Sequence, residues 1–160
     1  MKYNILIVED DKLLQRGLVA SLESLEVEIT VASSGNEAIE KIEGKNFHLV
    51  ITDIMMDNLD GFDLIKYINN SDKKIPFFII SSLGNNDDIL KGYSLKIIDY
   101  ITKPVNFELL NKKVQNFLEY TYPNTSSIQF HKSKNMVIIE GEEYTLTTKE
   151  YDLLEYLYKF

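Results

Sequence analysis

The sequence predicts an α/β fold: a doubly wound, five-stranded parallel sheet, followed by a small antiparallel β segment and one helix. The first observation is that short apolar runs alternate with stretches of helical periodicity from residue 3 to about residue 120, as in successive βα units. The second is that three of these runs are continuously apolar, as parallel strands are when helices cover both faces. The third is a change to short strand patterns after a stretch rich in Pro and small polar residues.

The predicted strands follow one another in chain order. The runs 5–8, 49–51 and 77–80 should be central strands, because they are apolar throughout. The segments 27–31 and 98–101 mix apolar and polar residues, so they should be the two edges. With the second and fifth strands at the edges, the order 2-1-3-4-5 fits, and this is the flavodoxin-like doubly wound order.

Helical periodicity separates these strands. The first predicted helix has one apolar stripe of Leu14, Leu18, Leu22 and Leu25, and the last has a stripe of Phe107, Leu110, Val114 and Phe117. Shorter helices are expected over residues 36–43, 62–69 and 87–94.

The chain is expected to divide into a first domain at 1–120, a linker at 121–126 and a second segment at 127–160. The linker prediction rests on Pro123 and its small polar neighbours. In the second segment, strands are expected at 128–130, 136–139 and 144–146, with a turn through 140–142 between the last two. Thr147 and Glu150 match a capping box that opens a helix with an apolar face of Tyr151, Leu154, Leu157 and Tyr158.

Composition excludes several classes of function. The 17 Lys and Arg against 25 Asp and Glu give a net charge of −8, so charge alone would repel nucleic acid and anionic lipid. The chain has no cysteine, which excludes disulfides, cysteine zinc sites and thiol nucleophiles. No signal-peptide pattern or membrane-length apolar run is present, so a soluble cytoplasmic protein is expected.

Three acids fall at the ends of two predicted neighbouring strands. Glu9 and Asp10 follow the first strand, and Asp53 follows the third. In a doubly wound sheet these residues would converge at the carboxyl edge, where such folds place their ligands. Crowded carboxylates repel one another, and a bound hard cation such as Mg²⁺ relieves that cost. Taken singly, each acid is more simply a helix cap or a solvated loop residue.

Two further residues strengthen the functional interpretation. Ser81 ends the fourth strand and Lys103 follows the fifth, which brings a hydroxyl and a cation to the same edge. A carboxylate nucleophile, a metal, a lysine and a hydroxyl together suit phosphoryl transfer. Alone, Lys103 would be a solvated residue before Pro104, and Ser81 a loop residue.

The segments ILIVEDD, LVITDIMMDNLDGFDL and IDYITKPV resemble the receiver domain of two-component response regulators, over about residues 1 to 120. The resemblance implies that Asp53 accepts a phosphoryl group from a sensor histidine kinase, and that the chain is a phosphoacceptor rather than an enzyme. It also implies Mg²⁺ held by Glu9, Asp10 and Asp53 with the Met55 backbone carbonyl. It further implies that Lys103 contacts the phosphoryl group and that the Lys103–Pro104 bond is cis. Ser81 would be the switch hydroxyl, and Tyr100 the aromatic residue whose rotation reports phosphorylation.

The sequence departs from the family pattern at several positions. Asp57 stands where the family usually has Pro, and Lys96-Ile97 where Gly-Ala is common. Ile89 and Leu109 replace an Arg and a Glu that often form salt bridges between two copies, whereas Asp99 and Lys113 could still pair. We therefore expect a more apolar candidate dimer face, formed by Ile89, Asp99, Leu109 and Lys113 on helix 4, strand 5 and helix 5.

Residues 127–160 resemble the start of the winged-helix effector domain of OmpR/PhoB-type regulators. The match rests on Leu146, Thr147, Glu150, Leu153 and Leu154. The recognition helix and wing are not in this sequence, and reading DNA requires that helix. The leading hypothesis is a response regulator that controls transcription in a full-length form. The main alternative is a stand-alone receiver acting through protein contacts; an aspartate phosphatase or a flavodoxin fits less well, because Asp-x-Asp and a phosphate loop are missing after Val8.

Overall fold

The computed structural model describes residues 2–56, 61–82, 97–122, 128–139 and 141–159. The chain divides into two compact units, residues 1–116 and residues 117–160.

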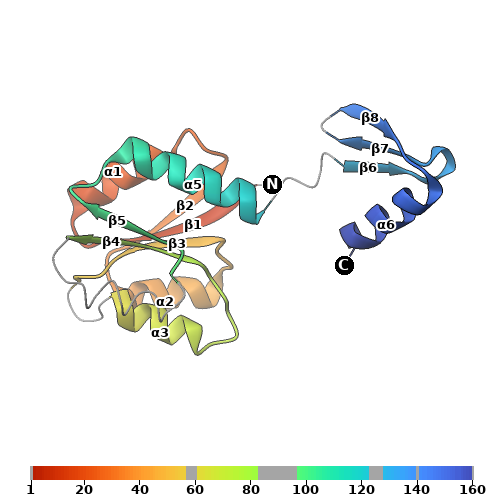
Figure 1. The fold of residues 1–160 in the computed structure, drawn as a ribbon. Coiled ribbons are helices and arrows are strands. Elements are labelled where there is room, and N and C mark those ends of the chain that lie inside the picture. The colour runs from red at the N-terminus through yellow and green to blue at the C-terminus, as the bar shows by residue number, and fades with distance from the viewer. Residues whose placement is uncertain (1, 57–60, 83–96, 123–127, 140, 160) are drawn as a thin grey trace. The chain divides into compact units, whose positions relative to one another are not determined.

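The first unit is built on a five-stranded parallel sheet (Figure 1). Its strands are β1 (Tyr3–Val8), β2 (Val27–Ala32), β3 (Leu49–Asp53), β4 (Phe77–Ser82) and β5 (Asp99–Lys103). They lie in the order β2-β1-β3-β4-β5. The predicted fold class and strand order are confirmed, including the two edge strands.

Two helices cover each face of the sheet in the described chain (Figure 1). The helices α1 (Lys12–Leu22) and α5 (Phe107–Thr121) lie on one face, and α2 (Gly35–Gly44) and α3 (Gly61–Asn69) lie on the other. The predicted stripe of the first helix is wrong at Leu25, because α1 ends at Leu22 and the chain turns, with the Leu25 N–H donating to the Leu22 carbonyl. The helix expected at 87–94 lies outside the described residues.

The alternation of side chains along the strands explains the two layers. In β1, Leu6 and Val8 belong to the apolar core that includes Ala38 and Ile42 of α2. Ile5 and Ile7 are equally buried but point to the opposite face, where α1 and α5 lie. Burial on both faces is the reason that this strand is apolar throughout.

The start of α5 rests on α1. A Cβ atom placed on Gly17 would lie 2.5 Å from Cζ of Phe107, so the aromatic ring occupies the space that the glycine leaves. Despite this contact Phe107 is 40% exposed, whereas Leu110 and Val114, further along the predicted α5 stripe, are completely buried. Further along, Asn111 Nδ2 donates to the Ser21 carbonyl at 2.6 Å and ties the two helices a second time.

The second unit contains a three-stranded antiparallel sheet in the order β6-β7-β8. Its elements are β6 (Ile128–His131), a 3-10 turn η2 (Lys132–Lys134), β7 (Met136–Ile139), β8 (Glu142–Thr145) and α6 (Thr148–Lys159). The last strand begins two residues before the predicted 144–146, since Glu142 already pairs with Ile139. Gly141 makes this tight connection with φ of +88°, a conformation that favours glycine.

The predicted capping box opens α6. Glu150 Oε2 accepts the Thr147 N–H at 2.8 Å, and Thr147 Oγ1 accepts the Glu150 N–H at 3.4 Å. Of the predicted apolar face, Tyr151 is buried and meets the Phe130 ring edge to face, but Leu157 is 65% exposed. In the described part of the chain, no helix is both long enough and apolar enough to cross a membrane.

Candidate functional site

The carboxyl edge of the sheet brings together residues that lie far apart in the sequence. Asp53 is the last residue of β3 and pairs with Ile80 of β4. Lys103 is the last residue of β5, and Glu9 follows β1 directly. Parallel strands all end on the same side, so their terminal side chains meet there.

Three carboxylates form an acidic cluster of Glu9, Asp10 and Asp53. One oxygen from each lies within 4.8 Å of the others. Glu9 is fully buried and Asp53 is nearly so, whereas Asp10 is exposed. The cluster therefore has two acids in its floor and one at its rim.

The two buried acids are held by different partners. Asp53 Oδ1 accepts the Met55 N–H at 3.1 Å, and Asp53 Oδ2 accepts from Lys103 Nζ at 2.6 Å. Glu9 Oε1 accepts the Asp11 N–H at 3.0 Å. Glu9 Oε2 is buried and has no hydrogen-bond partner among the described residues, and its nearest cation, Lys103 Nζ, lies 3.5 Å away.

Burial changes the proton affinity of the site. Desolvation raises the pKa of Glu9 from 4.5 to about 7, although the Asp11 N–H and the Lys103 charge both act to lower it. For Lys103, desolvation acts to lower the pKa, but the hydrogen bond to Asp53 and the charges of Asp53 and Glu9 outweigh it and raise the pKa. The lysine is thus firmly cationic, while the ionised glutamate carries a desolvation cost that the Asp11 N–H and the Lys103 charge offset only in part.

The donor set fits a hard divalent cation. Mg²⁺ prefers a few carboxylate oxygens and keeps several waters, and the rim position of Asp10 leaves such a cation open to solvent. Glu9 Oε2 supplies an independent sign, because it is buried without a hydrogen-bond partner among the described residues and its ion pair with Lys103 is long, at 3.5 Å. Cation binding would offset the cost of burying this oxygen.

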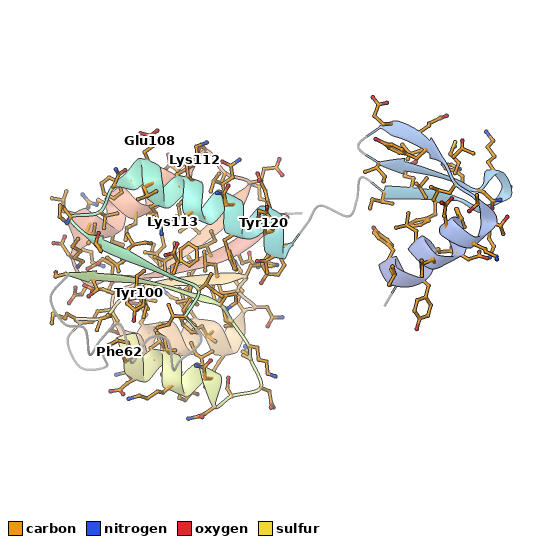
Figure 2. All side chains as sticks on the ribbon, viewed as in Figure 1. Phe62, Tyr100, Glu108, Lys112, Lys113 and Tyr120 are labelled. Carbon is orange, nitrogen blue, oxygen red and sulfur yellow. The ribbon has the colours of Figure 1, made fainter. Side chains whose placement is uncertain are left out.

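The remaining predicted site residues lie around this cluster. Ser81 Oγ donates to the Ser82 carbonyl at 3.3 Å, so in this structure its hydroxyl bonds to its own strand. Tyr100 is half-buried and packs against the apolar core on the α2 and α3 side of the sheet (Figure 2). The Lys103–Pro104 bond is cis, as the resemblance implies.

Part of the candidate dimer face lies in the described chain. Lys113 Nζ, on α5 (Figure 2), donates to Asp99 Oδ2 at 2.5 Å, so this pair forms within one chain. Leu109 is 53% exposed beside it. Ile89 lies outside the described residues, as do Asp57 and Lys96 of the family departures.

Sequence reasoning missed two residues that shape the site. A Cβ atom on Gly61 would lie 2.2 Å from the Asp53 carbonyl oxygen, so only glycine fits where α3 begins against β3. Gln15 is 6% exposed and its amide reaches the Glu9 carbonyl. The signal for Gln15 was a polar residue beside Leu14 and Leu18 on the buried side of α1.

Comparison with known proteins defines the class of this fold and site. The family model of the response regulator receiver domain matches residues 5–115. The chain therefore belongs to the response regulator receiver family, the signalling proteins of two-component systems.

Individual relatives match beyond the receiver. The nisin biosynthesis regulatory protein NisR of Lactococcus lactis is 28% identical over 98% of this chain and 74% of its own length. The transcriptional regulatory protein CusR of Escherichia coli is 28% identical over 95% of this chain and 70% of its own. The response regulator DrrB, a Thermotoga maritima OmpR/PhoB homologue, has a similar fold with a TM-score of 0.69 and 24% identity, covering 98% of this chain and 72% of DrrB.

Proposed function

We propose that this chain is a phosphorylation-dependent response regulator whose Asp53 accepts a phosphoryl group from a sensor histidine kinase. One observation carries the proposal: the Asp53 carboxylate lies between the Met55 N–H and the Lys103 ammonium, with the acidic cluster beside it. This is a nucleophile, a fixed cation and a metal-binding donor set in one place.

The chemistry assigned to Asp53 is a phosphoryl transfer from nitrogen to oxygen. A carboxylate oxygen of Asp53 attacks the phosphorus of a kinase phosphohistidine, the new phosphorus–oxygen bond forms as the phosphorus–nitrogen bond breaks, and the electron pair returns to the imidazole. Lys103 holds the Asp53 carboxylate by a hydrogen bond before the transfer and can move that hydrogen bond to a phosphoryl oxygen afterwards. Bound Mg²⁺, held by Glu9, Asp10, Asp53 and the Met55 carbonyl, would supply charge that neutralises the phosphoryl oxygens.

The switch is assigned to Ser81 and Tyr100. The acyl phosphate adds charge and acceptor oxygens at the end of β3, and these can draw the Ser81 hydroxyl away from the Ser82 carbonyl. The bond that Ser81 gives up is long, so exchanging it costs little. Tyr100 then has room to turn, which changes the surface around β5 and α5.

The output is assigned to transcription in a longer form of the protein. Residues 1–120 would be the receiver, 121–126 the linker, and 127–160 the amino-terminal part of an OmpR/PhoB-type winged-helix domain. The supporting facts are the β6-β7-β8 sheet followed by the capped α6, and the relatives CusR and DrrB that match most of this chain. A longer form that binds no DNA after phosphorylation would favour the stand-alone receiver instead.

The phosphoacceptor role is tested by intact mass. Wild type, Asp53→Asn and the control Asp63→Asn, which changes an exposed acid of α3, are incubated with acetyl phosphate and Mg²⁺, with and without EDTA. We expect one phosphoryl adduct on wild type and on the control, lost with EDTA and absent from Asp53→Asn. A folded wild type that never forms the adduct would contradict the proposal.

We further propose that phosphorylation promotes a homodimer through the helix expected at 87–94 (helix 4), β5 and α5. Because Lys113 pairs with Asp99 of its own chain, the exposed apolar side chains of Leu109 and Ile98 would supply the contact. Sedimentation with beryllofluoride as phosphoryl mimic should show a dimer for wild type and a monomer for Leu109→Glu, with Leu13→Glu as the matched exposed control. A wild type that stays monomeric at high concentration would argue against this interface.

A further inference from the structure

Gln15 is a buried amide whose contacts the phosphoacceptor chemistry does not explain. It lies in α1, one turn after the Asp11 cap, and is 6% exposed. Its Nε2 donates one hydrogen bond to the Glu9 carbonyl at 2.9 Å and another to the Ala32 carbonyl at 3.1 Å. A buried amide donor with two main-chain acceptors fixes the distance and direction between those two carbonyls.

These two carbonyls lie where the sheet ladder ends. The last paired residues of β1 and β2 are Val8 and Ala32, and beyond them the Glu9 N–H still donates to the Ala32 carbonyl at 3.0 Å. Gln15 restrains the second main-chain group of Glu9, because its Nε2 donates a hydrogen bond to the Glu9 carbonyl. Glu9 is therefore held at both of its main-chain groups, and its carboxylate is held by the Asp11 N–H.

Holding the Glu9 carbonyl also orients Asp10. The peptide between the two residues is planar, so a fixed Glu9 carbonyl fixes the direction in which the chain enters Asp10. Asp10 is the exposed member of the acidic cluster, and the main chain sets where its side chain starts. Small errors in ligand position weaken a Mg²⁺ site, because this cation demands nearly ideal octahedral geometry.

We infer that Gln15 is a positioning residue for the divalent-cation site: its amide ties the Glu9–Asp10 peptide to the end of β2 and so presents both acids to the cation. The inference rests on the proposed function, since it assigns a support to the metal site proposed there. In the structure Gln15 bonds the Glu9 and Ala32 carbonyls through Nε2, and its Oε1 accepts from Lys12 Nζ at 3.4 Å, so its effect on the site is assigned to the Glu9 main chain. Groups that support metal ligands in this way change metal affinity by about 10-fold to 100-fold when they are removed.

The test compares two amides that make the same kind of bond in different places. Gln15→Met keeps the size of the side chain and removes both donors, whereas the control Asn111→Leu removes the amide that ties α5 to the Ser21 carbonyl of α1. Mg²⁺ affinity is measured by calorimetric titration of the full chain, and folding by circular dichroism. We expect Gln15→Met to bind Mg²⁺ about 10-fold more weakly than wild type, and the control to bind within twofold of wild type.

A second readout separates positioning from loss of structure. Phosphorylation by acetyl phosphate is followed as a function of Mg²⁺ concentration for the same three proteins. For Gln15→Met we expect the half-saturating Mg²⁺ concentration to rise about 10-fold with little change in the maximal rate, whereas partial unfolding would lower the maximal rate instead. Unchanged Mg²⁺ affinity in folded Gln15→Met, or an equal loss in Asn111→Leu, would overturn the inference. A wild type that binds no Mg²⁺ would overturn the metal site itself, and the role of Gln15 with it.

Discussion

Raising the pH in the absence of divalent cations should destabilise the first unit through the Glu9 carboxyl. In the folded protein burial raises the pKa of Glu9 to about 7, against 4.5 for the free side chain. Between these two values the unfolded chain loses the Glu9 proton and the folded protein keeps it. The unfolded state then binds fewer protons, so the free energy of unfolding falls as the pH rises through this window and levels off above it.

The size of the effect follows from the same two values. The interval from 4.5 to about 7 corresponds to about 3 kcal/mol, and Glu9 is completely buried, so solvent does not screen the effect. The stability that Glu9 contributes is complete below pH 4.5 and is lost by about pH 8. Mg²⁺ should restore part of it, because the cation stabilises the ionised carboxylate.

Urea unfolding of wild type and Glu9→Gln in EDTA measures this contribution directly. Glutamine has the shape of the protonated acid and does not titrate, so the difference between the two proteins cancels all other titrating groups. We expect wild type to lose about 3 kcal/mol relative to Glu9→Gln between about pH 4 and pH 8. Glu40→Gln, at an exposed glutamate of α2, should follow wild type throughout. A difference between wild type and Glu9→Gln that does not change with pH would refute the reasoning.

Three further predictions concern particular side chains. Gly61→Ala should destabilise the protein by about 2 kcal/mol in urea unfolding and slow phosphorylation by acetyl phosphate, because the new Cβ would press on the Asp53 carbonyl; Gly44→Ala, which meets nothing within 4 Å, should do neither. Lys103→Met should bind Mg²⁺ more tightly by calorimetry, because the mutation removes the ammonium that competes with the cation for the Asp53 carboxylate. The same variant should accept a phosphoryl group at least about 10-fold more slowly, and weaker Mg²⁺ binding would contradict the prediction. Thr147→Ala should cost about 1 kcal/mol of protection from hydrogen exchange at the start of α6, whereas Lys149→Ala should leave it unchanged.

The sequence carried enough information for the sheet and for the position of the acids. Continuous apolar runs and strand-end acids are local patterns, and the strand order turns them into a site. It could not place Ser81, whose hydroxyl direction depends on a rotamer, nor show that Lys103 Nζ lies 2.6 Å from Asp53. The roles of Gln15 and Gly61 could not be predicted, because both residues contact main-chain carbonyls. Every residue has such a carbonyl, so the sequence does not indicate which one a side chain will meet.

The packing of Phe107 on Gly17 couples two positions that are 90 residues apart in the chain. A side chain added at position 17 would occupy the volume that the Phe107 ring already fills, so the total size of the two side chains is limited. Across related chains the residue sizes at positions 17 and 107 should vary in opposite directions: a larger residue at position 17 of α1 should accompany a smaller one at position 107 of α5. An enlarged residue at position 17 alone would push the start of α5 outward, and with it the short loop that follows Lys103.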